Sequence, residues 1–204
     1  MLKVGLTGSI GSGKTLVSNF FETIGVNVFY ADDSAKALYG NKKVKEEIVN
    51  VFGPSILTED NKIDTKIFAG IIFNDKSALK KINSIIHPLV MNDFLNWLTN
   101  YKTDAYILHE AAILFESDLS KKFDFVIAVS APEALRIERI MKRENVNREA
   151  VIARIKNQWS DERKAKLADF VILNDETELL IPQVLKVNKI LKQKKGCYEN
   201  NTLY

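Results

Sequence analysis

The feature that most constrains this chain is a glycine-rich stretch, VGLTGSIGSGKT, at residues 4–15. It follows an apolar run at 2–7 that is typical of a buried strand. It leads into 14–25, where apolar residues recur at helical spacing and Gly25 supplies a stop. A strand, a glycine-rich turn and a helix in this order favour an α/β protein with a parallel sheet.

The same stretch matches the pattern G-x-x-x-x-G-K-[ST] from Gly8 to Thr15. Glycines let the backbone turn its N–H groups toward a phosphate chain, and the helix that follows directs its positive dipole end there. Lys14 can reach the outer phosphates, and the Thr15 hydroxyl can ligate Mg²⁺. A plain turn would need only one or two glycines, so the pattern predicts a cradle for a nucleoside triphosphate. The residues expected to bind it are Gly8, Gly11, Ser12, Gly13, Lys14, Thr15 and Leu16.

Later apolar runs complete a predicted sheet of about five parallel strands with helices on both faces. The block from about 60 to 100 is helical, with its long helix interrupted by Pro88, and it reads as an insertion into a single domain of residues 1–204. The end, 194–204, has no period and is expected to fray. The remaining strands are expected at 26–30, 105–110, 123–131 and 169–174, and the remaining helices at 132–144, 148–168 and 176–193.

Composition excludes several classes of protein. No apolar run reaches the roughly 18 residues of a membrane span, and the N-terminus has no signal peptide, which predicts a cytoplasmic protein without a membrane partner. The net charge of +3 permits anionic ligands but does not indicate a nucleic-acid partner. One cysteine, Cys197, and two histidines cannot form a disulfide or a cysteine/histidine zinc site.

Two features favour a small-molecule phosphate acceptor. Asp32 follows the second predicted strand, where a carboxylate could take the proton from an attacking hydroxyl, although it could also only cap a helix. Arg136, Arg139 and Arg143 recur at spacings of three and four, which suits phosphate binding and a solvated helix face about equally. The chain also lacks the N-K-x-D pattern of GTPases.

Seven short blocks stand in order along residues 2 to about 175: GLTGSIGSGKT, ADDSAK, IIHPLV, ILFE, RIMKRENVNRE, NQW and ADFVILN. On these blocks the sequence resembles the dephospho-CoA kinase family. The resemblance implies a P-loop kinase of the nucleoside-monophosphate-kinase type, with a helical CoA domain and an arginine-bearing lid at about 139–160. Such enzymes move the γ-phosphate of ATP to the ribose 3′-hydroxyl of dephospho-CoA with Mg²⁺.

The resemblance also assigns roles to single residues. Asp32 matches the proposed base, and His87 matches a histidine near the acceptor. Arg139 and Arg143 match the phosphate-facing arginines, and Asn174 matches an asparagine near the adenine pocket.

This chain departs from the family pattern at Tyr30, which stands where the family usually has the first Asp of Asp-Ala-Asp. Glu110, at the end of the third strand, could hold a Mg²⁺-bound water or pair with a lysine. Two other functions stay open on the residues alone: a kinase for another nucleotide or small alcohol, and a non-catalytic nucleotide sensor. The oligomeric state is left open.

Overall fold

The structure is a computed structural model that describes residues 1–200. The side chains of 73, 74, 76 and 195–200 and the whole of 201–204 lie outside the described residues, and with them the Cys197 side chain and most of the tail expected to fray. The chain divides into two compact units. The first comprises Met1–Tyr30 and Tyr101–Tyr204, and the second is Ala31–Asn100.

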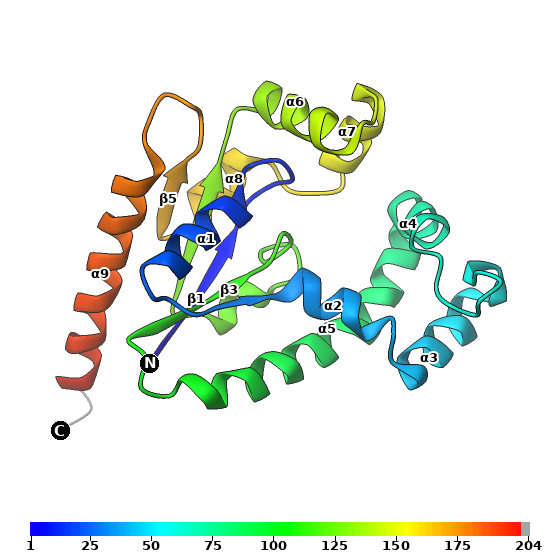
Figure 1. The fold of residues 1–204 in the computed structure, drawn as a ribbon, viewed down its shortest axis with the longest axis horizontal. Coiled ribbons are helices and arrows are strands. Elements are labelled where there is room, and N and C mark those ends of the chain that lie inside the picture. The colour runs from blue at the N-terminus through cyan, green and yellow to red at the C-terminus, as the bar shows by residue number, and fades with distance from the viewer. Residues whose placement is uncertain (201–204) are drawn as a thin grey trace. The chain divides into compact units, whose positions relative to one another are not determined.

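The first unit is built on a parallel sheet of five strands in the order β2-β3-β1-β4-β5 (Figure 1), which confirms the predicted fold class. Because β1 lies at the centre, the glycine-rich stretch leaves from the middle of the carboxyl edge of the sheet. The strands are β1 (Leu2–Thr7), β2 (Val28–Tyr30), β3 (Tyr106–Glu110), β4 (Phe125–Ser130) and β5 (Phe170–Leu173).

Two helices of this unit cover one face of the sheet. Phe21 from the first helix meets Tyr106 of β3 edge-to-face with ring centroids 6.5 Å apart, and Leu191 from the last helix joins the same buried cluster. On the other face a Cβ added at Gly5 would lie 2.5 Å from Leu114, so residues 111–124 pack directly against the sheet. The helices are α1 (Lys14–Thr23), α6 (Glu133–Glu144), α7 (Arg148–Ile155), α8 (Asp161–Leu167) and α9 (Leu180–Asn200), with a 3₁₀ turn, η3 (Leu119–Lys122).

The single helix expected over 148–168 is wrong, because α7 ends at Ile155 and α8 begins at Asp161. Ser160 caps the new helix: its Oγ accepts a hydrogen bond from the Arg163 backbone N–H at 3.3 Å. The four residues before Ser160 carry no glycine or proline, so the only local mark of the break is the helix-start pattern of Ser160 followed by Asp161 and Glu162, which the helical spacing around it outweighs.

The second unit, Ala31–Asn100, is helical, and two of its helices precede residue 60. The long helix passes through Pro88 without ending, since its packing against neighbouring helices outweighs one lost hydrogen bond. Phe68 is the centre of the core, in T-shaped contact with Tyr39 and Phe52 at 5.9 and 5.1 Å. The elements are α2 (Ala31–Leu38), α3 (Lys42–Phe52), η1 (Pro54–Ile56), α4 (Thr65–Asn74) and α5 (Lys76–Leu98), followed by η2 (Thr99–Tyr101).

Candidate active site

The glycines of the P-loop, residues 8–15, are required by close approach of the protein's own groups. A Cβ at Gly11 would lie 2.7 Å from the carbonyl oxygen of Arg136, and one at Gly13 would lie 2.1 Å from the side-chain nitrogen of Asn174. Both glycines have positive φ, +81° and +91°. The loop is therefore pressed against α6 and the end of β5, with its backbone in a shape that only glycine adopts cheaply.

Lys14 begins α1 and is held at the carboxyl edge of the sheet. Its Nζ donates to the Gly8 carbonyl oxygen at 3.1 Å and lies 3.9 Å from Glu110 Oε1. Both side chains are largely buried, and Glu110 ends β3, the neighbour of β1. Of the two roles left open for Glu110, pairing with a lysine is the one seen here. A cation and a carboxylate thus face each other beside the loop.

A segment far away in sequence, Gln158–Asp161, forms hydrogen bonds with the P-loop at Ser9 and Ile10. Gln158 Oε1 accepts the Ile10 backbone N–H at 2.8 Å. The Ser9 hydroxyl donates to the Trp159 carbonyl oxygen at 3.2 Å, and Asp161 Oδ1 accepts the Ser9 N–H at 3.3 Å. These residues could not be assigned a role from sequence beyond the NQW block, because nothing local links positions 158–161 to positions 9 and 10.

Arg136 does not share the exposure of the two arginines that follow it on α6. Its side chain is 4% exposed, its Nε donates to the Ala131 carbonyl oxygen at 3.1 Å, and that Nε lies 3.6 Å from Asp161. Asp161 Oδ2 also accepts the Ala131 N–H at 3.0 Å. Arg136 is therefore a structural residue that braces α6 and α8, and the expected common arginine face is wrong at this position.

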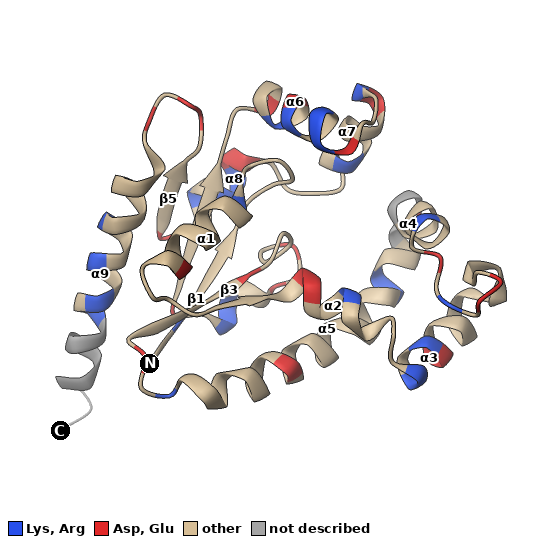
Figure 2. Ribbon diagram, in the orientation of Figure 1, with Lys and Arg blue, Asp and Glu red and all other residues tan. Residues whose placement is uncertain are grey.

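Arg139 and Arg143 lie further along α6, where Figure 2 shows several basic segments. The Nη2 group of Arg139 donates to the Asn174 carbonyl oxygen at 3.1 Å and to Glu176 Oε1 at 3.0 Å. Arg143 is mostly exposed and pairs with Glu144 at 2.5 Å. The Asn174 side chain in turn donates to the Ser12 carbonyl oxygen at 2.8 Å, so Asn174 joins α6 to the P-loop.

Tyr30 ends β2 and its hydroxyl donates to Glu22 Oε2 of α1 at 3.0 Å. Burial, together with the Glu22 carboxylate, raises the pKa of Tyr30 far above its ordinary value. Tyr30 therefore stays neutral and contributes no negative charge where the family pattern has its first aspartate. The carboxylate that the structure brings beside Lys14 is Glu110.

Asp32 and His87 belong to the helical unit. Asp32 is the exposed second residue of α2, and because the helix already begins at Ala31, its place is the first turn rather than the cap. Its neighbour Asp33 pairs with Lys36 at 3.0 Å. His87 is half-buried within α5, and burial lowers its pKa. Thr15 and Leu16 are exposed on the first turn of α1.

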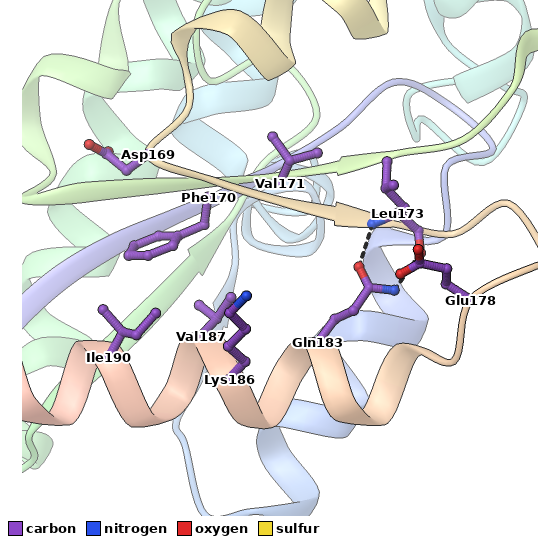
Figure 3. A pocket seen from close by; sticks show the side chains of 9 residues that line it. All are labelled: Asp169, Phe170, Val171, Leu173, Glu178, Gln183, Lys186, Val187 and Ile190. Atoms are coloured by element: carbon purple, nitrogen blue, oxygen red, sulfur yellow. Dashed lines mark hydrogen bonds between the residues drawn. The ribbon is translucent and has the colours of Figure 1, made fainter.

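A separate groove lies between β5 and α9 (Figure 3). Gln183 reaches across it, accepting the Leu173 N–H at 2.8 Å and donating to the Leu173 carbonyl oxygen at 3.0 Å. These bonds satisfy the backbone N–H and carbonyl groups of Leu173 at the outer edge of the last strand, which makes them unavailable for pairing with another chain. None of the residues lining the groove is an expected site residue, and it runs along the edge of the sheet rather than at the carboxyl ends of the strands.

Two findings concern the described residues as a set. No group of three or more Asp, Glu, His or Cys that could hold a metal occurs among the described side chains. Of the described helices, none has the length and apolar character needed to cross a membrane.

A glycine cradle after the central strand of a parallel sheet, with a lysine inside it and arginines on the helix beside it, defines a P-loop kinase. A family model described as dephospho-CoA kinase matches residues 2–179, nearly the whole of the predicted fold. The chain belongs to the dephospho-CoA kinase family.

Individual relatives agree. A dephospho-CoA kinase of Fusobacterium nucleatum subsp. nucleatum is 41% identical over 172 residues, covering 84% of this chain and 89% of the relative. One from Bacteroides fragilis (strain YCH46) is 36% identical over 194 residues, covering 95% and 94%. A crystal structure from Thermus thermophilus matches with a TM-score of 0.84 at 28% identity, covering 93% of this chain and 96% of that one.

Proposed function

We propose that this enzyme transfers the γ-phosphoryl group of ATP to the ribose 3′-hydroxyl of dephospho-CoA, giving coenzyme A and ADP. The observation that carries the proposal is the cradle itself: Lys14, held between Gly8 and Glu110 at the end of β1, in a chain of the dephospho-CoA kinase family. In this role Lys14 and Arg139 stabilise charge on the transferred phosphoryl group, with Arg143 closing from the lid. The protein acts in the cytoplasm.

The donor set suits Mg²⁺, which prefers oxygen ligands and keeps several waters. The Thr15 hydroxyl would be its direct ligand, and Glu110 would hold a metal-bound water. When bound, the ion supplies neutralisation of the phosphate charge. Tyr30, neutral and bonded to Glu22, adds nothing to this set. Glu110 would therefore hold the metal-bound water without a carboxylate at position 30, where the family pattern has its first aspartate.

Asp32 is the proposed general base, with His87 near the acceptor. The Asp32 side chain is exposed and lies in the first turn of α2, so its carboxylate can meet a substrate hydroxyl. Asn174 is proposed to lie against the adenine end of ATP, since it joins the P-loop to α6. The helical unit, 31–100, would then carry the acceptor, and the lid at about 139–160 would close over the donor.

The decisive experiment is ADP release with Mg²⁺-ATP and a panel of acceptors: dephospho-CoA, AMP, adenosine and shikimate. Selective turnover of dephospho-CoA is expected. A preference for shikimate or AMP would replace the proposal with a kinase for another acceptor, and ATP binding without turnover of any acceptor would replace it with a nucleotide sensor. Lys14→Ala should abolish most turnover, because the phosphate charge loses its nearest cation.

Asp32→Asn tests the base, and Asp33→Asn is its matched control. Asparagine keeps the size of the side chain but cannot accept the proton, so kcat for dephospho-CoA should fall by roughly 10²–10⁴-fold with ATP binding unchanged. Asp33→Asn changes the same charge one residue away and should leave kcat near normal. Equal behaviour of the two variants would remove Asp32 from the mechanism.

A further inference from the structure

The feature that leads beyond the assigned site is the contact between Arg139 of α6 and Glu176 of the loop after β5. One amino group of the Arg139 guanidinium, Nη2, donates both to Glu176 Oε1 at 3.0 Å and to the Asn174 carbonyl oxygen at 3.1 Å. The other, Nη1, is buried and has no hydrogen-bond partner among the described residues. The arginine is therefore fixed along one edge, with donors left over on the other.

Glu176 holds this contact from a costly backbone shape. Its φ is +69°, in the left-handed region, where a residue other than glycine or asparagine is strained by about 1–2 kcal/mol. The loop is set by Asp175, whose Oδ1 accepts the N–H groups of Thr177 and Glu178 at 3.0 and 3.3 Å. Glycine at 176 would relieve the strain, so the Glu176 side chain is held beside Arg139 at a cost to the backbone.

The pair lies on the β5 side of the P-loop. Asn174, which shares Nη2 of Arg139 with Glu176, also donates to the Ser12 carbonyl oxygen at 2.8 Å. Lys14 and Glu110 lie on the opposite side, because β3 and β4–β5 flank β1 on different edges. Whatever Glu176 does to Arg139 therefore acts on the Asn174 side of the cradle and not on the Glu110 side.

We propose that Glu176 is a positioning residue for the donor nucleotide: its carboxylate holds one edge of the Arg139 guanidinium so that the free edge donates to the polyphosphate of ATP. This rests on the proposed role of Arg139 on the donor phosphates. A long, flexible side chain fixed before binding loses less conformational entropy on binding. The benefit falls on ATP affinity and on the transfer step in which Arg139 also acts, whereas binding of the acceptor is untouched.

Three variants test the proposal: Glu176→Gln, Glu176→Gly and the control Glu178→Gln, which removes the same charge two residues along the loop. Both Glu176 variants should raise the Kd and KM for ATP by about 3- to 10-fold, the cost of ordering one freed side chain. The value of kcat should fall as well, because Arg139 also acts on the transferred phosphoryl group, whereas the KM for dephospho-CoA should change by less than about twofold. Glu178→Gln should match the wild type.

Glu176→Gly separates positioning from stability. Because glycine adopts positive φ without strain, the melting temperature of the Glu176→Gly variant should equal or exceed that of the wild type, while the ATP affinity of the variant falls. Unchanged ATP affinity in both Glu176 variants would overturn the proposal. So would a loss of affinity that follows a loss of thermal stability.

A double-mutant cycle with Arg139→Ala shows whether Glu176 acts through the arginine. In the Arg139→Ala background, Glu176→Gln should have no further effect on the Kd for ATP, and additive effects would overturn the proposal. The Kd for ATP is measured by calorimetry without acceptor, so that failure of the proposed function and failure of the role of Glu176 give different results. No ATP binding by the wild type would refute the proposed function, whereas binding that is equal in wild type and Glu176→Gln would refute only the role of Glu176.

Discussion

The side-chain nitrogen of Asn174 lies 2.8 Å from the carbonyl oxygen of Ser12 and donates a hydrogen bond to it across 162 positions of sequence. The bond runs directly over Gly13, where an added Cβ would meet that nitrogen at 2.1 Å. The last strand therefore sets the shape of the loop that follows the first one, and the glycine is required as much by Asn174 as by a phosphate.

Gly13→Ala should lower the free energy of unfolding by about 2–4 kcal/mol, because alanine at positive φ is strained and its Cβ displaces Asn174. Gly25→Ala is the matched control: its φ is +82°, but nothing lies within 4 Å of the added Cβ. It should cost only the backbone part, about 1–2 kcal/mol. Urea unfolding of both variants measures the difference, and equal losses would show that the contact with Asn174 has no energetic weight.

His109 should make the protein sensitive to acid. It is fully buried in β3 between the rings of Phe29 and Phe123, and burial lowers its pKa to about 4. Since the folded pKa lies below the unfolded value of about 6.5, protonation favours the unfolded chain. The stability from the neutral ring is complete above about pH 6.5, and up to about 3 kcal/mol of it is lost as the pH falls toward 4.

The measurement is the free energy of unfolding of wild type and His109→Leu from pH 7 to 4. The variant should show a shallower loss over this window. His87→Asn is the comparison, since His87 is only half-buried and should alter the slope less. Superimposable slopes for wild type and His109→Leu would contradict the assignment.

Lys164→Met should destabilise the protein by about 3–5 kcal/mol. The Lys164 side chain is 1% exposed, and its Nζ donates to Glu116 Oε1 at 2.9 Å and to the Ala112 carbonyl oxygen at 2.8 Å. Removing the cation leaves the Glu116 carboxylate without its countercharge. The double variant Glu116→Gln with Lys164→Met should therefore lose less than the two single losses combined. Additive losses in urea unfolding would mean that the two charges do not interact.

Hydrogen exchange should divide the lid region into a fixed base and a moving part. The Ile10 and Trp159 amides, bonded to Gln158 and Glu116 at 2.8 and 2.9 Å, should be protected with and without ligands. Amides over 144–156 should gain protection when ATP and acceptor bind, because closure excludes water. Equal protection over 144–156 in both states would count against a moving lid.

The sequence was sufficient to predict those parts of the fold whose signal lies in neighbouring residues. The P-loop, the five strands and the stop at Gly25 all follow from residues that lie within a few positions of each other. The break between α7 and α8 could not be predicted, because Gln158 and Trp159 leave the helical pattern to bind the distant Ser9 and Ile10. That choice depends on tertiary contacts, which the local pattern does not contain.

The arginines of α6 show the same limit for the site. Arg136 and Arg139 are the same residue type at helical spacing, yet one is buried against Asp161 and the other reaches Glu176. Spacing alone gives both the same role. Glu176 carried no signal either, because a left-handed backbone is normally marked by glycine. The roles of these arginines can be told apart only from the partner that each side chain contacts in the structure.

The bonds from Asp161 and Asn174 to the P-loop also determine the order of events as the chain is made. The central strand β1 is synthesised before its neighbours β3 and β4, which come from residues 106–110 and 125–130. The loop at 8–15 is bonded on both of its sides only after Asp161 and Asn174 have also been made. A growing chain thus carries its glycine-rich loop long before it has the residues that hold that loop in its folded shape.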